Sequence, residues 1–416
     1  MTEFNELSQN LTKKLDKKEK KENGIYFTCN SIITSTLKIL TKYIRKKELG
    51  IKNILEPSCG SCQFINNIDK LCNYDILNGV EFNNTIFNNI KDLYTDNNKI
   101  NLFNQDFLLY DVKIKYDLII GNPPYFVINK PKDKVKLDYY NNNILPYKKK
   151  YKIGRVNIYI IFILKCLDLL NDDGIMAFVL PKNFLNCLYY NKVRDEIYKN
   201  YKIIDIIDHS KNEYLETEQN TCMFIIQKCK GKNNKFTFKL DDNIIFNSKE
   251  TIKKITELCN NTTSIDKMGF KVCVGTCVWN QNKDILTNDN SKTRLIYNSN
   301  IVNNELKLVE FSNKQKKNYI DKEGKKDIIL VVNRGYGKGE YIFNYCLVDI
   351  EEDYLIENHL ICITSKDVVE KEELIKKYKI IINSFNNKKT NEFISLYFEN
   401  NAINTTELQY VLPIFI

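Results

Sequence analysis

The chain carries Tyr116-Asp-Leu-Ile-Ile-Gly-Asn-Pro-Pro-Tyr125, an apolar run that passes into an amide, two prolines and an aromatic residue. The run Tyr116–Gly121 is typical of a buried parallel strand. Two consecutive prolines neither continue a strand nor enter a helix, so the strand should end in a stiff loop. Ligands of open α/β sheets bind at the carboxyl ends of the strands. The pattern therefore predicts that the loop Asn122-Pro123-Pro124-Tyr125 stands at the ligand edge of a sheet.

This loop offers groups that suit a flat substrate bearing an NH2 group. The side-chain oxygen of Asn122 and a backbone carbonyl of the loop can each accept one N–H of such a group. The ring of Tyr125 can stack on the face of the substrate. These residues therefore predict a binding site for an aromatic amine.

The predicted loop belongs to a longer alternation of strands and helices. The predicted strands are 52–56, 75–80, 100–103, 116–120, 175–180, 203–208 and 221–227. Helices are expected at 31–45, 158–170 and 183–200, and the last two strands should form an antiparallel end. This alternation predicts an α/β fold with a doubly wound, mostly parallel seven-stranded sheet.

Polar residues follow the first three predicted strands at the same edge of the sheet. The first strand runs into the small-residue turn 57–64, which should open a helix, and the next two strands end near Glu81 and Asp106. Glu81 lies about 20 residues beyond Gly60, the distance at which a nucleotide-binding unit needs a carboxylate for ribose hydroxyls. The turn and the two acids together predict a nucleotide-like ligand.

The rhythm of strands and helices ends after a predicted linker at 231–235. We therefore expect two domains, a catalytic domain at 1–230 and an α+β domain at 235–416 that closes with a helix near 367–399. Residues 126–157 are rich in Lys, Tyr and Asn and are expected to form a mobile surface loop beside the site.

Composition limits the compartment and the chemistry. The 416 residues carry a net charge of +10, which favours a polyanionic partner only weakly. Thirteen cysteines, with no signal peptide and no long apolar span, predict free thiols in a cytoplasmic protein without membrane contact. Only two histidines are present, so the spacing of Cys59 and Cys62 does not predict a metal site, and no metal is expected.

These residues resemble the gamma-class adenine-N6 DNA methyltransferases of restriction–modification systems. The matching stretches are Gly24-Ile-Tyr-Phe-Thr28, Ile54-Leu-Glu-Pro-Ser-Cys-Gly60, Val80-Glu81, Gln105-Asp106-Phe107, Gly121-Asn-Pro-Pro-Tyr125 and Phe178-Val-Leu-Pro181. The resemblance implies a class I methyltransferase fold whose second domain recognises the DNA target. It also implies transfer of a methyl group from S-adenosylmethionine to the N6 amino group of adenine. Cys62 and Cys29 depart from the family, which often has Gly and Pro there.

The resemblance also implies which residues hold the cofactor. They are Thr28, Glu56, Ser58, Gly60, Glu81, Phe82, Asp106 and Phe107. Glu56 would lie near the methionine end, Glu81 would bond the ribose, and Asp106 would accept from the exocyclic amine. Phe82 would flank the adenine of the cofactor.

For catalysis, we expect the Asn122 side chain and the Pro123 carbonyl each to accept one N–H of the target amine, with Pro124 stiffening the loop. The nitrogen would then be drawn toward tetrahedral geometry without a covalent intermediate. The target base must leave the duplex to be reached. Tyr125 would stack on one of its faces, and Tyr214 matches the position of a second stacking aromatic in the family.

Duplex DNA is the expected partner, and several residues are expected to contact it. They are Lys149, Arg155, Trp279, Asn280, Arg334 and Lys338. The amides beside Trp279 suit adenine edges, and the two basic residues of the turn at 333–339 suit phosphate or guanine. We expect a monomeric, stand-alone methylase, and a separately encoded restriction endonuclease remains open as a second partner.

Other functions stay open at this point. The same tetrapeptide occurs in methyltransferases that act on RNA adenine and on protein glutamine, and cytosine-N4 enzymes are similar but more often carry Ser in place of the Asn. A non-catalytic DNA-binding subunit is a further alternative. The C-terminal domain favours DNA over RNA or protein as the substrate.

Overall fold

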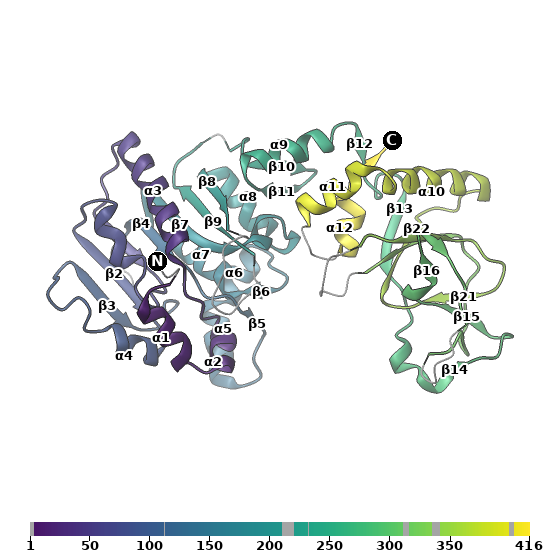
Figure 1. Ribbon diagram of the computed structural model, residues 1–416, viewed down its shortest axis with the longest axis horizontal. Coiled ribbons are helices and arrows are strands. Elements are labelled where there is room, and N and C mark those ends of the chain that lie inside the picture. The colour runs from purple at the N-terminus through teal and green to yellow at the C-terminus, as the bar shows by residue number, and fades with distance from the viewer. Residues whose placement is uncertain are drawn as a thin grey trace. The chain divides into compact units, whose positions relative to one another are not determined.

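The computed structural model describes residues 4–111, 113–209, 220–231, 233–310, 316–334, 342–398 and 403–416 (Figure 1). The chain divides into two compact units, Met1–Ile252 and Lys253–Ile416.

The first unit is built on a seven-stranded sheet of order β3-β2-β1-β4-β7-β9-β8. Its strands are β1 (Asn53–Glu56), β2 (Ile76–Glu81), β3 (Ile100–Asn104), β4 (Tyr116–Gly121), β7 (Leu170–Pro181), β8 (Lys202–Asp208) and β9 (Thr221–Gln227). The first five are parallel, whereas β9 is antiparallel to both β7 and β8. This arrangement confirms the doubly wound, mostly parallel seven-stranded sheet with an antiparallel end.

Helices and short hairpins surround this sheet. The helices are α1 (Glu6–Lys14), α2 (Lys17–Asn23), α3 (Asn30–Lys47), α4 (Asn84–Ile90), α5 (Lys134–Asn143), α6 (Leu145–Lys150), α7 (Ile158–Leu169) and α8 (Asn191–Asn200), and a further helix, α9 (Lys249–Leu258), spans the boundary between the units. The 3-10 helices are η1 (Ile65–Lys70), η2 (Lys182–Leu185) and η3 (Leu188–Tyr190). The hairpins pair β5 (Val127–Ile128) with β6 (Val156–Asn157), and β10 (Thr237–Leu240) with β11 (Asn243–Phe246).

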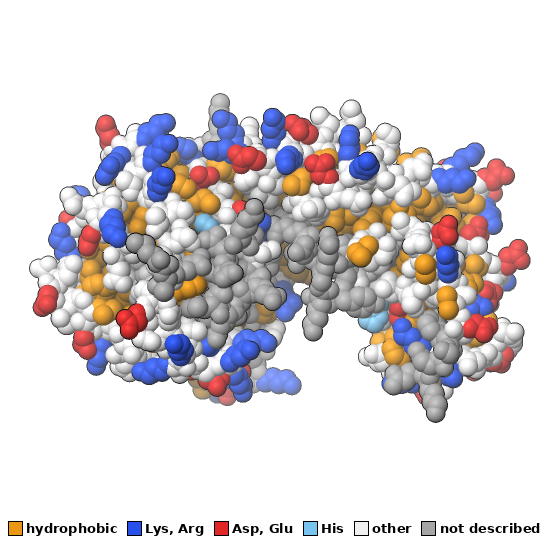
Figure 2. All heavy atoms as spheres, viewed as in Figure 1, with side chains coloured by type: hydrophobic (Ala, Val, Ile, Leu, Met, Phe, Trp, Pro, Cys, Tyr) orange, Lys and Arg blue, Asp and Glu red, His pale blue; other side chains and the backbone are white. Residues whose placement is uncertain are grey.

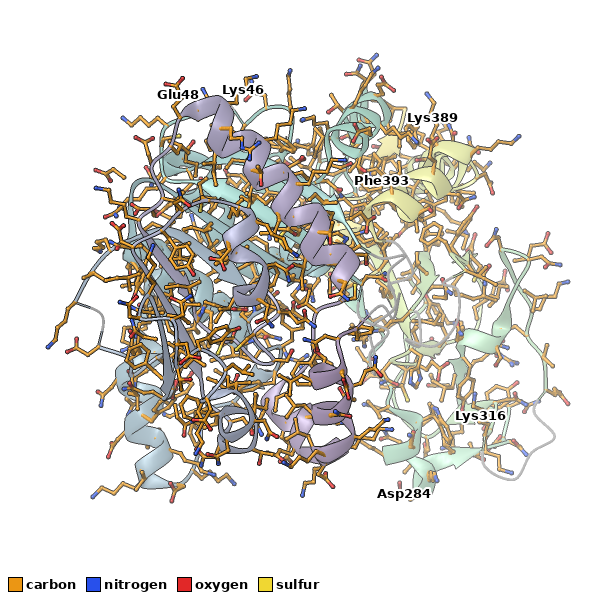
Figure 3. All side chains as sticks on the ribbon, turned by 60° about the vertical axis from the view of Figure 1, so that its left-hand side comes forward. Lys46, Glu48, Asp284, Lys316, Lys389 and Phe393 are labelled. Atoms are coloured by element: carbon orange, nitrogen blue, oxygen red, sulfur yellow. The ribbon has the colours of Figure 1, made fainter. Side chains whose placement is uncertain are left out.

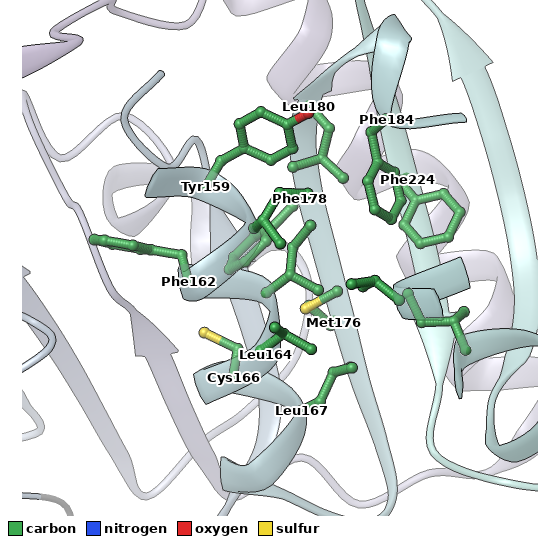
Figure 4. Close-up of a cluster of buried hydrophobic side chains, with 14 of the residues drawn as sticks. Tyr159, Phe162, Leu164, Cys166, Leu167, Met176, Phe178, Leu180, Phe184 and Phe224 are labelled. Atoms are coloured by element: carbon green, nitrogen blue, oxygen red, sulfur yellow. The ribbon is translucent and has the colours of Figure 1, made fainter. Parts of the chain in front are cut away.

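The sheet has a separate hydrophobic core on each face, because successive residues of a strand point to opposite sides. On β7, Met176 and Phe178 pack in one cluster with α7 and α8 (Figure 4). Their neighbours Ala177 and Val179 pack in the other cluster with α3 and η1. The central strands are therefore buried on both sides, which explains their continuous apolar sequences.

The helix expected at 31–45 is α3, which ends after a basic last turn (Figure 3). Its final residue is followed by Glu48, which has a left-handed backbone with φ of 53°. The expected helix opening at the turn 57–64 is not an α-helix, because that segment continues through further turns into η1. The expected helix at 183–200 is likewise shorter, since its first part forms η2 and η3 before α8 begins.

Residues 126–157 form an ordered segment rather than the expected surface loop. The segment contains β5, α5, α6 and β6. The side chain of Asp133 caps α5 by accepting the N–H of Lys136 at 3.0 Å. Tyr140 and Ile144 then bury their side chains in the core beside α7. These tertiary contacts, which the polar composition does not reveal, explain the difference.

The first unit continues beyond the boundary that the linker composition suggested near residue 235. The hairpin β10–β11 packs on the sheet, because the ring of Phe246 stacks on Phe224 with centroids 5.8 Å apart. The buried guanidinium of Arg194 joins the same region by donating to the carbonyls of Ile244 and Phe184. The compact unit therefore ends at Ile252, within α9.

The second unit has an α+β composition and confirms the additional C-terminal domain. One four-stranded sheet has β13 (Phe270–Val274), β22 (Leu360–Ser365), β19 (Ile329–Asn333) and β20 (Tyr345–Val348) in that order. The other has β14 (Leu286–Thr287), β18 (Tyr319–Ile320), β15 (Thr293–Ile296) and β21 (Tyr354–Ile356). The remaining strands are β12 (Thr262–Thr263) with β23 (Ile414–Phe415), and β16 (Ile301–Val302) with β17 (Glu305–Leu306).

The α-helices that follow β22 lie toward the C-terminal end of the second unit, and its 3-10 helices lie between β13 and β16. The α-helices are α10 (Lys371–Phe385), α11 (Lys388–Tyr397) and α12 (Thr405–Tyr410), and the 3-10 helices are η4 (Trp279–Gln281), η5 (Lys283–Ile285) and η6 (Asn298–Asn300). The single closing helix expected near 367–399 is thus two helices. The break falls at Asn387, whose side chain caps α11 by accepting the N–H of Lys389.

None of the thirteen cysteines, all of which lie in the described ranges, forms a disulfide. Over the described ranges, no helix combines the length and the apolar character needed to cross a membrane.

Candidate active site

A cavity of about 510 Å³ lies where the parallel strands of the first unit end. Its wall includes eight of the residues singled out from the sequence, namely Ser58, Gly60, Glu81, Phe82, Asp106, Phe107, Asn122 and Pro124. Four others, Thr28, Glu56, Pro123 and Tyr125, adjoin lining residues along the chain. The structure therefore brings the glycine turn, the two acids and the amide loop to one cavity.

The Glu81 carboxylate holds the glycine turn in place. Its Oε2 accepts the backbone N–H of Gly60 at 2.9 Å, and its Oε1 accepts that of Asn83 at 2.7 Å. Gly60 has φ of 50°, a backbone conformation that favours glycine. Burial raises the pKa of Glu81 to about 7, even though these N–H donors favour the charged form. A cofactor hydroxyl would thus meet a carboxyl group that titrates near neutral pH.

The Asp106 carboxylate is fixed by one donor on each oxygen. The backbone N–H of Leu108 donates to Oδ1 at 2.8 Å, and the hydroxyl of Tyr139 donates to Oδ2 at 2.7 Å. The loop that follows is held by Lys165, whose ammonium lies 2.7, 3.0 and 3.1 Å from the carbonyls of Phe107, Leu108 and Tyr110. The carboxylate therefore has a defined orientation at the cavity wall.

The orientation of the Asn122 amide follows from its neighbours. Its Nδ2 donates to the backbone carbonyl of Tyr26 at 2.9 Å, so Oδ1 is left as the acceptor. The hydroxyl of Tyr125 lies within hydrogen-bond reach of that Oδ1 and is also 2.8 Å from the carbonyl of Val179. Because a hydroxyl has one proton, a bond to Val179 would release Oδ1 for a substrate N–H.

The N-terminal segment packs directly on the amide loop. Gly24 has φ of 62°, and a Cβ at this position would lie 2.4 Å from the backbone nitrogen of Tyr125. The ring of Tyr26 stacks beside that of Tyr125, with centroids 6.4 Å apart and an angle of 23° between the rings. Both contacts require the segment to lie close against the loop.

Glu56 is a buried acid at the end of β1. Among the described residues, its Oε2 has no hydrogen-bond partner. Burial raises the pKa of Glu56 well above its usual range, and nearby Cys62 and Glu81 act in the same direction. An unpartnered buried carboxyl oxygen fits a cationic group such as the ammonium of S-adenosylmethionine.

The residues at this cavity fit S-adenosylmethionine. Glu81 and Asp106, which line it, suit ribose hydroxyls and an exocyclic N–H, and Glu56, which precedes the lining residue Pro57, suits the ammonium. Phe82, which is 64% exposed, and Phe107 supply rings at the same wall.

Of the residues expected to contact DNA, the five that the structure describes are not among those that line this cavity. Lys149, on α6, and Arg155 are exposed. In the second unit, Asn280 is exposed, and Arg334 is exposed at the end of β19. Trp279 is half-buried, with the ammonium groups of Lys283 and Lys316 lying 5.8 and 5.6 Å from its ring. On the face drawn in Figure 2, basic and acidic side chains are interspersed rather than gathered in one patch.

Two of the predicted residues fall outside the described ranges. They are Tyr214, the expected second stacking aromatic, and Lys338, in the expected basic turn. Clusters of three or more His, Cys, Asp or Glu side chains suited to a metal ion are absent from the part of the chain that the structure describes.

Sequence reasoning missed three side chains of this site. The composition of residues 126–157 predicts a loop at Tyr139. A sequence signal for the helix that carries it is Asp133, a residue type that often caps helices. Tyr26 lies within the quoted stretch Gly24–Thr28 but was not singled out. Lys165 lies in an apolar helix, where a lone lysine is a signal of a specific partner.

The sheet order and the cavity at the carboxyl ends of its strands define the class I methyltransferase fold. Residues 23–215 match the family model described as Eco57I restriction-modification methylase. The match covers the glycine turn, both acids and the amide loop.

Similarity to known methyltransferases extends over the whole chain. The chain is 28% identical over 419 residues to the Type II methyltransferase M.CvrRI of Paramecium bursaria Chlorella virus XZ-6E, with 99% of each protein covered. It is 26% identical over 433 residues to the modification methylase CviBIII of Paramecium bursaria Chlorella virus NC1A, again with 99% of each covered. The chain is therefore homologous to Type II methyltransferases.

One solved structure supports the fold of the chain. The DrdV–DNA complex aligns with a TM-score of 0.56 and 13% identity, and the alignment covers 98% of this chain and 57% of that chain. At this level of identity, the likeness concerns the fold alone.

Proposed function

We propose that this chain is a site-specific DNA methyltransferase that transfers a methyl group from S-adenosylmethionine to the N6 amino group of adenine in duplex DNA. The observation that carries the proposal is a single cavity whose wall contains both Asp106 and Asn122. One residue suits recognition of a nucleoside cofactor, and the other suits an amine substrate. The relatives named as Type II methyltransferases support a role in restriction–modification.

The acids at the strand ends would hold the cofactor. Glu81 would accept a ribose hydroxyl while keeping its bonds to the turn, and Asp106 would accept the exocyclic N–H of the adenine. Glu56 would lie near the ammonium of the methionine end, with Thr28 and Ser58 beside it. When bound, S-adenosylmethionine supplies a methyl group on a positively charged sulfonium.

The amide loop would make the target nitrogen reactive. The lone pair of an adenine amino group is delocalised into the ring, so the group is a poor nucleophile. Asn122 Oδ1 and the Pro123 carbonyl would each accept one N–H and draw the nitrogen toward tetrahedral geometry. Pro124 would keep the loop rigid, so that these dipoles need no reorganisation during the reaction. The chain would thus act by positioning and fixed dipoles.

The target base would have to leave the duplex, because the amide loop lies at the wall of a cavity in the protein. Tyr125 would then stack on the base, and Tyr214 would supply the second aromatic contact. The second unit would recognise the DNA sequence, with Trp279, Asn280 and Arg334 among the contacting residues. Lys149, Arg155 and Lys338 would contact the DNA as well.

The test is to identify the methylated product. The purified chain is incubated with tritiated S-adenosylmethionine and duplex DNA, RNA or protein, and the labelled DNA is digested to nucleosides. We expect label in DNA, as N6-methyladenine. Label in N4-methylcytosine would replace adenine by cytosine as the target, and label in RNA or protein would contradict the DNA assignment. Cofactor binding without transfer to any of them would favour a non-catalytic subunit.

A further inference from the structure

Tyr139 is the side chain that completes the environment of Asp106. It lies on α5, within the segment whose composition suggested a loop, and it lines the cavity. Its hydroxyl donates to Asp106 Oδ2 at 2.7 Å, a contact that joins residues 33 positions apart. A carboxylate on a loop would otherwise be free to turn about its last torsion angle.

Two groups donate hydrogen bonds to the Asp106 carboxylate, and they fix the directions of the lone pairs that remain free to accept another hydrogen bond. Each carboxylate oxygen has two lone pairs. The Leu108 N–H occupies one on Oδ1, and the Tyr139 hydroxyl occupies one on Oδ2. The remaining lone pairs can accept an N–H from a ligand in the cavity. Orientation of the carboxylate by Tyr139 therefore decides where that N–H is best placed.

The position of Tyr139 is itself fixed by the helix that carries it. Asp133 caps the start of α5, and the next residue, Tyr140, is 3% exposed in the core. Burial raises the pKa of Tyr139 far above its ordinary value, with the neighbouring Asp106 acting in the same direction. The hydroxyl therefore remains a protonated donor throughout the physiological range.

We propose that Tyr139 is a positioning residue that orients the Asp106 carboxylate to recognise the exocyclic amino group of the cofactor's adenine. This inference rests on the proposed function. The inference adds to the proposed function the residue that makes the adenine pocket selective for an amino group over a carbonyl oxygen.

The test compares two ligands in calorimetric titrations of the full chain. S-adenosylhomocysteine carries the amino group, whereas S-inosylhomocysteine has a carbonyl oxygen in its place and cannot donate there. We expect the wild-type chain to prefer the adenosyl ligand. Tyr139→Phe should weaken binding of the adenosyl ligand about tenfold, because a bond through a charged acceptor loses its geometry. Binding of the inosyl ligand should change little, so the preference should shrink.

Tyr140→Phe is the matched control, because it removes the neighbouring hydroxyl on the same helix. It should leave the preference between the two ligands unchanged, and thermal melting checks that both variants are folded. If Tyr139→Phe weakens both ligands equally or leaves the preference intact, the positioning role is wrong. If the wild-type chain binds neither ligand, the proposed function itself fails.

Discussion

At the residue scale, Glu81 accepts hydrogen bonds in a charged form that its burial opposes near neutral pH. Its carboxyl group accepts the N–H groups of Gly60 and Asn83, which hold the glycine turn. The same group is buried, and burial raises its pKa to about 7. The charged form suits a ribose hydroxyl donor, whereas the protonated form is favoured by burial alone. Because the pKa is raised on folding, ionisation of Glu81 costs stability as the pH rises through about 7.

Cofactor affinity is therefore expected to increase with pH. The ionised fraction of Glu81 rises from about one tenth at pH 6 to about nine tenths at pH 8, so the Kd for S-adenosylhomocysteine should fall about tenfold over this range. Titration calorimetry at pH 6, 7 and 8 measures this dependence. Glu81→Gln should bind more weakly and without this slope. An equal slope in the variant would assign the titration to another group.

At the element scale, the segment after α2 and the amide loop form one structural assembly. Gly24 ends α2 in a left-handed conformation, and the missing side chain lets it touch the backbone of Tyr125. The neighbouring Tyr26 carbonyl accepts the Asn122 amide N–H. The shape of the loop therefore depends on a segment almost a hundred residues earlier in the chain.

Gly24→Ala is expected to disturb this assembly. The added Cβ would lie 2.4 and 2.9 Å from backbone atoms of Tyr125, and alanine is strained at φ of 62°. We expect a loss of about 1–3 kcal/mol in the free energy of unfolding and at least a tenfold fall in methyl transfer. Chemical denaturation and a transfer assay measure the two effects. Gly50→Ala is the control, because its Cβ would have no atom within 4 Å. Equal behaviour of the two variants would refute the packing argument.

Some helices and strands could be predicted from the sequence and others could not. The strands around residues 118, 177 and 224 are long apolar runs because both sheet faces are covered, so local pattern was enough. The composition predicts a loop in place of α5 and α6. These helices depend on the burial of Tyr140 and Ile144 in a core whose other residues lie far away in the sequence. The linker composition predicts a boundary before the hairpin β10–β11, whereas Phe246 of this hairpin packs on Phe224, a contact that composition does not reveal.

The candidate site likewise contains residues that the sequence could predict and residues that it could not. Glu81, Asp106 and Asn122 each follow an apolar strand, so their convergence on one sheet edge could be predicted. The partners that orient them could not, because Tyr139 and Tyr26 contact them across long stretches of sequence. Motif and spacing predict these three residues, whereas the Tyr139 hydroxyl that donates to Asp106 and the Tyr26 carbonyl that accepts from Asn122 come from tertiary structure.

At the scale of the whole molecule, each unit has hydrophobic clusters of its own, and we expect the two units to have separate tasks. The first unit contains the cavity, and the second carries Trp279, Asn280 and Arg334, three of the residues expected to contact DNA. Substitutions in the second unit should therefore change DNA binding without changing cofactor binding.

Arg334→Ala tests this division of tasks. Loss of a contact to phosphate or guanine should weaken binding of target DNA about tenfold. The Kd for S-adenosylhomocysteine should stay the same, as measured by calorimetry beside a DNA-binding titration. Arg45→Ala, which removes an exposed charge from α3, controls for the change in net charge. A matching loss of DNA affinity in both variants would leave no specific role for Arg334.

The most direct test of the central claim is the single-turnover rate of methyl transfer by Asn122→Ala at saturating S-adenosylmethionine and DNA. We expect a fall of at least a hundredfold, because removal of one preorganised hydrogen-bonding group costs about that much, with the Kd for S-adenosylhomocysteine close to that of the wild-type chain. Transfer at the wild-type rate would contradict the claim that this amide makes the amine reactive.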